Sequence, residues 1–225
     1  AECEPLLQKD RETMSRQADE MLRGLQLMKQ LTGAARVTIA VKRKNEDVLD
    51  QMSAQAVELG FELFIYEDVY PAGDEYVLVY EITERRIPPG GIPLDVGCVV
   101  DNVETIVNLA RAVDGTPVTE KYVTVCGAVQ QPLTTVVPVG ISMADCVELA
   151  GGATVDNPVA LTGCLMMGST TSDLSIPVTK ITGGIIVLPE DHYLYQRKTQ
   201  SKTTYTRIGH GQCDQCSLCT ELCPR

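Results

Sequence analysis

"RVTIAVKRKNEDVLDQMSAQAVELGFELFIY", residues 36–66, is the stretch that decides the fold of the first half of the chain. It begins and ends with runs rich in β-branched and aromatic residues, 36–41 and 61–66, which predict two buried strands. Between the runs, apolar residues recur at helical spacing and predict one face of a helix: Val48, Leu49, Met52, Ala56 and Leu59. Asn45 is placed to cap this helix and Gly60 to end it. A strand, a helix and a strand of these lengths form a βαβ unit with a parallel sheet.

The segments on either side extend this unit into an α/β domain, which we predict to cover residues 1–117. Apolar residues at helical spacing predict one helix from Asp10 to Leu31. The region 70–97 is rich in Pro and Gly and contains one helical piece near Glu75–Thr83. A further helix is predicted from Asn102 to Val113, with an apolar face that can pack on the rest of the domain.

After residue 117 the chain becomes rich in predicted strands. "KYVTVCGAVQQP" predicts a strand that runs into a turn, and "LTTVVPVG" predicts its partner, while "PVALTG" and "GGIIVLP" supply further strands. Ser142 and Asp145 have the spacing of a capping box before a short helix. One short helix among several strands predicts a small α+β domain at residues 118–190. Residues 191–225 form a tail, whose polar part from Tyr193 to Gly211 we interpret as a linker or as a segment that wraps over the surface.

The composition limits the class of function. Hydrophobic residues make up 44% and charged residues 22% of the 225, which is typical of a globular protein. The net charge of −11 argues against nucleic-acid binding, because phosphate recognition requires clustered Lys and Arg. No apolar run approaches the roughly 18 residues of a membrane span, and the sequence shows no signal peptide. We therefore predict a cytoplasmic protein without a direct membrane span, and a start at Ala1 leads us to expect a fragment or a processed chain.

The nine cysteines divide into a terminal run and five scattered residues. The scattered ones are expected to be reduced and buried: Cys3, Cys98, Cys126, Cys146 and Cys164. The terminal run, "CDQCSLCTELCPR", has the spacing C-x2-C-x2-C-x3-C-P of bacterial ferredoxins and predicts [4Fe-4S] ligands at Cys213, Cys216, Cys219 and Cys223. In two-cluster proteins the fourth cysteine of such a run binds the other cluster, which would leave the first with three ligands here. A structural zinc site is the alternative.

Two shorter stretches have less specific patterns. In "AECEPLLQKDR", Glu2 and Glu4 fit either a solvated chain end or carboxylates that bind sugar hydroxyls or a nicotinamide amide. The stretch "KITGG", residues 180–184, is a candidate for phosphate recognition, although we favour a turn into the last strand. The sequence contains no G-x-G-x-x-G, HExxH or Walker pattern and no Ser-His-Asp order, so hydrolase and kinase functions have no support.

Four stretches occur in an order that resembles the NADH-binding flavoprotein subunit of respiratory complex I: "ECEPLLQKDR", "AGDEYVLVYEITERR", "IPPGGIPLDVG" and "DNVETIVNLARAV". The chain is more similar to two groups of relatives of that subunit, the C subunits of Rnf electron-transport complexes and the cobalamin reductases of propanediol-utilising microcompartments. In this family, segments of matching sequence surround FMN and NADH. The resemblance therefore implies cofactor-binding roles for Glu2, Glu4, Gly73, Glu75 and Asn102.

The same resemblance extends to the rest of the chain. Residues 118–190 are similar to the soluble-ligand-binding β-grasp (SLBB) module of the family, and the terminal cysteines are similar to the first of its two ferredoxin-type runs. The whole protein is then expected to be an NADH-dependent oxidoreductase subunit with FMN and [4Fe-4S] clusters. Its partners would be a corrinoid protein or other subunits of a redox complex, with homo-oligomers as a further option. It would act at the cytoplasmic face of a membrane complex or in a bacterial microcompartment.

Two parts of the family pattern are absent from these 225 residues. One is the glycine-rich loop that holds the flavin phosphate, and the other is the second cysteine run. We therefore expect this chain alone to bind neither NADH nor FMN tightly. The competing hypothesis is a non-catalytic scaffold or ligand-binding module whose cysteine tail holds zinc.

Overall fold

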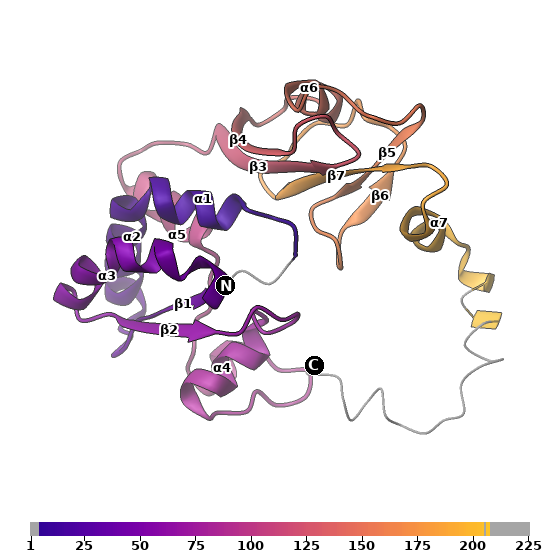
Figure 1. Ribbon diagram of the computed structural model, residues 1–225. Helices are drawn as coiled ribbons and strands as arrows, with labels where there is room; N and C mark the ends of the chain where they lie inside the picture. The colour runs from indigo at the N-terminus through magenta and orange to yellow at the C-terminus, as the bar shows by residue number, and fades with distance from the viewer. Residues whose placement is uncertain (1–4, 205, 208–225) are drawn as a thin grey trace.

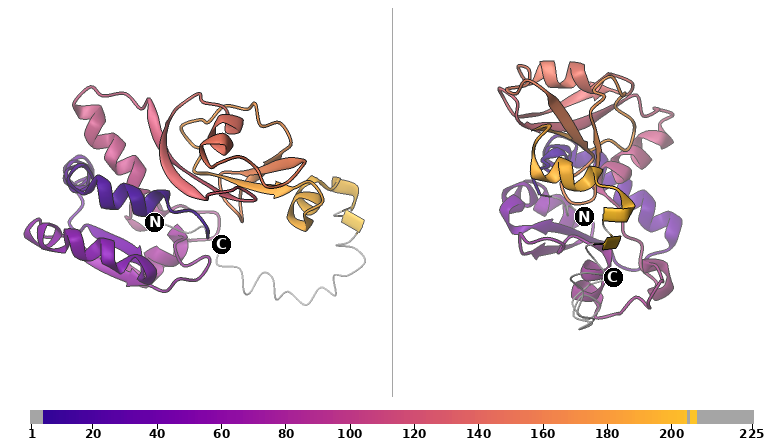
Figure 2. Two further views of the ribbon diagram at one scale, coloured as in Figure 1. Left: turned by 45° about the horizontal axis from the view of Figure 1, so that its top comes forward. Right: turned by 90° about the vertical axis from the view of Figure 1, so that its right-hand side faces the viewer.

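The computed structural model describes residues 5–204 and 206–207. The described chain forms two parts that lie side by side (Figure 1 and Figure 2). The first is built of helices around a two-stranded parallel sheet, and the second around a five-stranded mixed sheet. This architecture confirms the predicted combination of an α/β and an α+β fold. None of the described helices is both long and apolar enough to cross a membrane.

The elements of the first part are α1 (Lys9–Arg16), α2 (Ala18–Thr32), β1 (Thr38–Lys42), α3 (Glu46–Glu58), β2 (Glu62–Tyr66), α4 (Glu75–Thr83) and α5 (Val103–Val113). Short 3₁₀ turns lie at Arg43–Asn45 and Pro93–Val96. Strands β1 and β2 pair in parallel, which confirms the predicted βαβ unit. In Figure 1, helices α1 to α3 lie on one side of this sheet and α4 lies on the other.

The prediction of one helix from Asp10 to Leu31 is wrong, because the chain breaks at Gln17. Gln17 has φ −131° and ψ 35°, outside the helical region. The break separates two packing partners. Helix α1 packs on α5 and on the second part of the chain, whereas α2 packs mainly along α5. The apolar spacing continues through the break, so periodicity alone does not reveal it.

The core of the first part contains apolar side chains from α1, α2, β1, α3 and α5. Its buried members are Met14, Met21, Leu22, Ile39, Val41, Val48, Leu49, Met52, Ala56, Phe61, Ile106 and Val107. Helices α2 and α5 approach closely at Gly24, where an added Cβ would lie 2.1 Å from the carbonyl oxygen of Ile106. Glycine at this position therefore fixes the distance between the two helices.

The second part contains β3 (Glu120–Gly127), β4 (Leu133–Pro138), α6 (Met143–Leu149), β5 (Pro158–Thr162), β6 (Ser169–Thr171) and β7 (Gly184–Pro189). The strand order is β4-β3-β7-β5-β6. Strands β3 and β7 are parallel, and the other pairs are antiparallel. Helix α6 contributes Met143, Cys146 and Val147 to a core with β3, β5 and β7. As predicted, Ser142 caps α6 and accepts a hydrogen bond from the Asp145 N–H.

The segment that we interpreted as a linker from Tyr193 begins with a helix, α7 (Tyr193–Thr199). His192 caps it, because Nδ1 of its ring accepts a hydrogen bond from the Leu194 N–H. Lys198 joins α7 to the loop between β5 and β6 by donating hydrogen bonds to the carbonyls of Met166 (3.1 Å) and Gly168 (2.8 Å). The helix is stabilised by contacts with a distant loop, which its polar sequence does not indicate.

Candidate functional site

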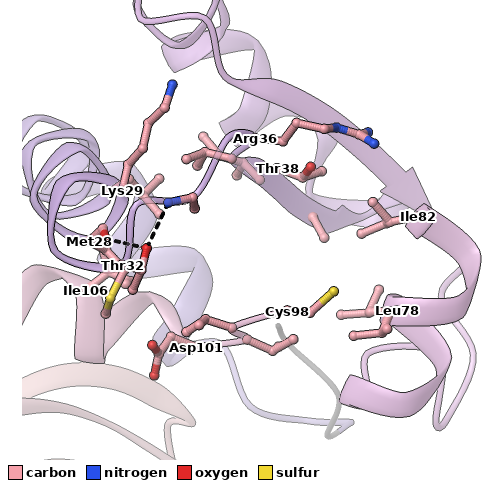
Figure 3. Close-up of a pocket in the computed structure, with 18 of the residues that line it drawn as sticks. Met28, Lys29, Thr32, Arg36, Thr38, Leu78, Ile82, Cys98, Asp101 and Ile106 are labelled. Atoms are coloured by element: carbon pink, nitrogen blue, oxygen red, sulfur yellow. Dashed lines mark hydrogen bonds between the residues drawn. The ribbon is translucent and has the colours of Figure 1, made fainter. Parts of the chain in front are cut away.

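A cavity of about 860 Å³ lies beside β1 in the first part of the chain, and Figure 3 shows many of the residues that line it. Its walls come from β1, α2, α4 and the segment 94–106. The volume falls in the range of roughly 300–1,000 Å³ that is typical of small-molecule and cofactor sites. Most of the wall is apolar, with side chains that include Met21, Leu25, Met28, Leu78, Val79 and Ile82.

The cavity runs along the free edge of β1. Every residue from Thr32 to Val41 lines it, so successive strand residues whose side chains point to opposite faces are all included. Within the described part of the chain, β1 is paired with β2 alone. A strand edge of this kind presents backbone N–H and C=O groups. The cavity therefore combines apolar walls with a row of hydrogen-bonding groups, an arrangement suited to a flat ligand or an extended chain.

Three cations line the cavity, and two of them already have partners. The guanidinium of Arg36 donates to the Glu62 carboxylate, with Nε···Oε1 at 2.9 Å and Nη2···Oε2 at 2.6 Å. The hydrogen bond to Glu62, followed by the attraction between the two charges, raises the pKa of Arg36. Arg85 donates from Nη1 to the Val96 carbonyl (2.9 Å). Lys29 is the third cation and lies half-buried near the end of α2.

Asp10 and Asn102 form a polar corner of the cavity at the first turn of α5. The side-chain oxygen of Asn102 caps α5 by accepting a hydrogen bond from the Glu104 N–H (3.0 Å). Its Nδ2 donates to Oδ2 of Asp10 (3.0 Å), while the Lys9 Nζ donates to the other carboxylate oxygen (2.6 Å). Asn102 is thus held at both ends of its amide, and the partially positive end of α5 opens beside it.

This corner belongs to a larger buried network of charges that crosses between the two parts of the chain. Glu104 accepts from Lys9 (3.3 Å) and, through its other oxygen, pairs with Lys121 of β3 (3.2 Å). The Lys121 ammonium also donates to the carbonyl of Lys180 (2.6 Å). The side chain of Lys121 is 1% exposed and that of Lys9 is 14% exposed. Two lysines and two carboxylates, those of Asp10 and Glu104, therefore balance within the network.

Burial affects the two lysines differently. Desolvation lowers the pKa of Lys121, and the neighbouring Glu104 carboxylate offsets this only in part. Desolvation is also the largest single effect on Lys9, but the combined attraction of Asp10 and Glu104 outweighs it and raises the pKa of Lys9. Lys9 is held by two carboxylates, whereas Lys121 has one close carboxylate and also faces the charge of Lys9.

Of the cofactor-binding residues implied by the resemblance, Asn102 lines the cavity. Gly73 is buried just before α4, and Glu75 is the first residue of that helix; both belong to the first part but lie outside the cavity lining. Glu2 and Glu4 lie outside the described residues. The predicted metal ligands Cys213, Cys216, Cys219 and Cys223 also lie outside them.

The charge network was missed in the sequence, apart from Asn102. Lys9 and Asp10 stand in "QKDR" beside the segment considered for its carboxylates, and Glu104 lies in "DNVETI". Lys121 gives the one usable signal, because it occupies an inward position of a strand whose alternate members, Val123 and Val125, are fully buried. A lysine at such a position requires a buried carboxylate nearby.

The scattered cysteines meet the expectation of burial only in part. Cys98, Cys126, Cys146 and Cys164 all carry free thiols, but Cys146 alone among these four is fully buried. Burial, with a further contribution from the charge of Asp145, raises the pKa of Cys146 to about 11. The described ranges contain no cluster of three or more His, Cys, Asp or Glu residues with metal-binding geometry. Cys3 lies outside the described residues.

The described residues fit one end of a flavin mononucleotide. The apolar walls suit a flat aromatic ring, and the polar corner at Asn102 and the first turn of α5 suits its polar edge. The phosphate is not matched: Gly33 and Gly97 line the cavity singly, and the described lining has no glycine-rich turn with successive N–H groups. Residues 5–204 and 206–207 thus fit the ring of a flavin but offer no match to its phosphate.

Curated relatives match along the full length of the chain. Cobalamin reductase PduS of Citrobacter freundii is 45% identical over 226 residues, and that of Salmonella typhimurium is 46% identical. The C subunit of the proton-translocating ferredoxin:NAD(+) oxidoreductase complex of Clostridium ljungdahlii is 27% identical. Each match covers 100% of this chain but 50%, 50% and 47% of the relative, so the chain spans about half the length of these proteins.

Solved structures agree on the fold. Crystal structures of NAD+-reducing [NiFe]-hydrogenase in the H2-reduced and air-oxidised states match with TM-scores of 0.71 and 0.67 at 21% and 22% identity. These matches cover 97% and 84% of this chain, and 44% and 39% of the hydrogenase chains. Residues 1–111 match the Nuo51 FMN-binding domain model and residues 122–167 match the SLBB domain model. Residues 1–111 are therefore similar to the Nuo51 FMN-binding domain and residues 122–167 to the SLBB domain, as the resemblance implied.

Proposed function

We propose that this chain is the flavin-binding and β-grasp portion of an NADH-dependent oxidoreductase, whose whole length passes electrons from NADH through FMN and [4Fe-4S] clusters to an acceptor. The observation that carries the proposal is the position of Asn102, which lies at the first turn of α5 and at the polar corner of a large apolar cavity. When bound, FMN would supply the exchange between hydride and single-electron chemistry. The residues of this chain would bind and orient it.

The acceptor that we propose is a corrinoid. The relatives named as cobalamin reductases are 45% and 46% identical to this chain, whereas the Clostridium ljungdahlii relative, which belongs to an ion-translocating complex, is 27% identical. Transfer to another subunit of a redox complex is the alternative, and the measured acceptor decides between them. A cytoplasmic or microcompartment location follows from the corrinoid proposal and belongs to it.

The residue roles are part of the same proposal. Glu2, Glu4, Gly73, Glu75 and Asn102 would surround the flavin and nicotinamide. Cys213, Cys216 and Cys219 would hold one [4Fe-4S] cluster, and Cys223 would bind either this cluster or a second one. In this proposal residues 1–117 form the flavin-binding domain and residues 118–190 form the β-grasp domain. Residues 191–225 contain the linker and the cluster ligands.

The test uses the whole protein purified without oxygen. We expect brown protein that contains iron, acid-labile sulfide and FMN, and that reduces a cobalamin with NADH as electron donor. Colourless protein with zinc in place of iron would contradict the proposal and support a scaffold. Substitution of Asn102 by Ala is expected to lower the FMN content. Substitution of Asn108 by Ala is the matched control, because Asn108 lies on the same helix outside the cavity lining.

A further inference from the structure

The glycine pair at the start of β7 makes room for the N-terminal segment of the chain. A Cβ added to Gly184 would lie 2.4 Å from Cδ2 of Leu7, and one added to Gly183 would lie 2.9 Å from Cε of Lys9. Neither glycine has its φ in the left-handed region, so backbone conformation does not require glycine at these positions. The requirement is space, because residues 7–9 pass directly over the pair.

Hydrogen bonds and burial hold the same segment on the five-stranded sheet. The Gln8 N–H donates to the Thr124 hydroxyl of β3 (3.0 Å), and this hydroxyl lies 2.9 Å from the hydroxyl of Thr134 on β4. Leu7 is 7% exposed. The second part therefore holds the backbone at Gln8 and lies against the side chains of Leu7 and Lys9.

Lys9 links this anchored segment to the residues that line the cavity. Its ammonium pairs with Asp10, which holds the Asn102 amide, and with Glu104 in the first turn of α5. Lys121 of β3 holds Glu104 from the other side. Asp10 and Asn102 line the cavity, whereas Lys121 and Gly183 do not. The polar corner of the cavity is thus reached from the second part by two routes, one through Gly183 and Lys9 and one through Lys121 and Glu104.

We propose that the five-stranded domain positions the polar corner of the cavity, with Lys9, Lys121 and Gly183 acting as positioning residues for Asp10 and Asn102. The five-stranded domain then influences the geometry of the cavity in the first part of the chain. A displacement of the sheet moves Lys9 and Glu104, and with them the amide and the helix end that face the cavity. Occupancy of the cavity and the position of the sheet are consequently coupled in both directions. The proposal deepens the proposed function, since it takes FMN as the ligand of the cavity.

The first test measures FMN binding by the whole protein carrying Lys121→Met, Lys121→Arg or Lys180→Met. Lys121→Met removes the charge that holds Glu104, and we expect the dissociation constant of FMN to rise about tenfold, within the usual range for coupled sites. Lys121→Arg keeps a cation and is expected to restore most of the affinity. Lys180→Met changes an exposed side chain but leaves the carbonyl that accepts from Lys121, so it is the matched control.

A second variant covers the case in which Lys121→Met fails to fold. Gly183→Ala displaces only the flexible end of Lys9, because the nearest atoms to the new methyl are Cε and Cδ of that side chain. We expect weaker FMN binding in this variant as well. Unchanged FMN affinity in Gly183→Ala, and in Lys121→Met where that variant folds, would overturn the proposal even if the variants were less stable.

Amide hydrogen exchange separates this inference from the flavin assignment. In protein without added flavin, Gly183→Ala is expected to speed exchange in the first turns of α1 and α5, and Lys180→Met is not. Faster exchange there without any FMN binding by the unmodified protein would reject the flavin and retain the coupling. Normal exchange in Gly183→Ala, together with normal FMN affinity, would reject the coupling and retain the flavin.

Discussion

Lys121 of β3 and Glu104 of α5 form an ion pair with Nζ···Oε1 at 3.2 Å, and this pair joins the two parts of the chain. The lysine side chain is 1% exposed and the glutamate side chain 20% exposed, so water screens the pair weakly. On the opposite side, Glu104 accepts from Lys9. The network lies where α1, α5 and β3 meet, and each charge depends on the others to remain buried.

Lys121→Met is expected to destabilise the protein by about 3 kcal/mol, because removal of one member of a buried ion pair leaves Glu104 with only part of its compensating charge, that of Lys9. The measurement is the free energy of unfolding in urea. Lys180→Met, a change of an exposed lysine in the same neighbourhood, is expected to remain within about 0.5 kcal/mol of the unmodified protein. Equal stability of the two variants would show that the buried pair contributes nothing.

The effect of Lys9→Met on the free energy of unfolding is expected to depend on pH. The pKa of Lys9 is raised above its ordinary value of 10.5 in the folded state. Its ion pairs therefore contribute stability that is fully present below 10.5 and is lost as pH rises through the folded value. The difference in unfolding free energy between the unmodified protein and Lys9→Met should stay constant from about pH 7 to about pH 9 and shrink at higher pH. A free-energy difference that already decreases between about pH 7 and about pH 9 would contradict this assignment.

Gly24→Ala is expected to destabilise the protein although alanine favours helix by roughly 1 kcal/mol. The new Cβ would lie 2.1 Å from the Ile106 carbonyl oxygen, so α2 and α5 must separate. Overpacking of this kind costs about 1–3 kcal/mol, which outweighs the gain in propensity. Thermal unfolding checks this, with Gln30→Ala at an exposed position of α2 as the control for propensity. A stabilised Gly24→Ala protein would mean that the two helices can separate here without loss of packing.

Cys146 is expected to resist alkylation in the folded protein. Its side chain lies in the core beneath α6, and its pKa of about 11 leaves very little thiolate near neutral pH. Iodoacetamide near pH 8 should leave Cys146 unmodified and should modify it after denaturation, as read by mass spectrometry of its peptide. Cys98, half-buried in the cavity lining, serves as the more accessible comparison. Rapid labelling of Cys146 in the folded state would contradict the burial.

Local patterns in the sequence were enough to predict the main elements. The βαβ unit at 36–66, the helix at Glu75–Thr83 and the capping of α6 by Ser142 all follow from side-chain periodicity and from polar groups within a few residues. The expected cap at Asn45 is confirmed in position only, because its side chain makes no capping hydrogen bond to α3. The family resemblance rested on the same short motifs and identified the two kinds of domain.

The break at Gln17 and helix α7 were not predictable in this way, because both depend on partners distant in the sequence. Helix α1 turns away from α2 in order to pack on the second part, and α7 is held by carbonyls of the loop before β6. The resemblance identified Asn102, but no local pattern showed that Lys9 and Glu104 contact it and that Lys121 pairs with Glu104.

The sequence by itself thus determined most of the elements, the cap at Ser142 and the family resemblance, since these depend on interactions over a few positions. Only the tertiary structure decided which charges are buried together. It also decided that Gly183 and Gly184 have no space for a side chain, because Leu7 and Lys9 lie over them. Lys9 and Lys121 are far apart in the sequence, and Leu7 is farther still from Gly184. Their contacts exist because the two parts pack against each other, and the energy of a buried charge or a close approach is defined only once that packing is in place.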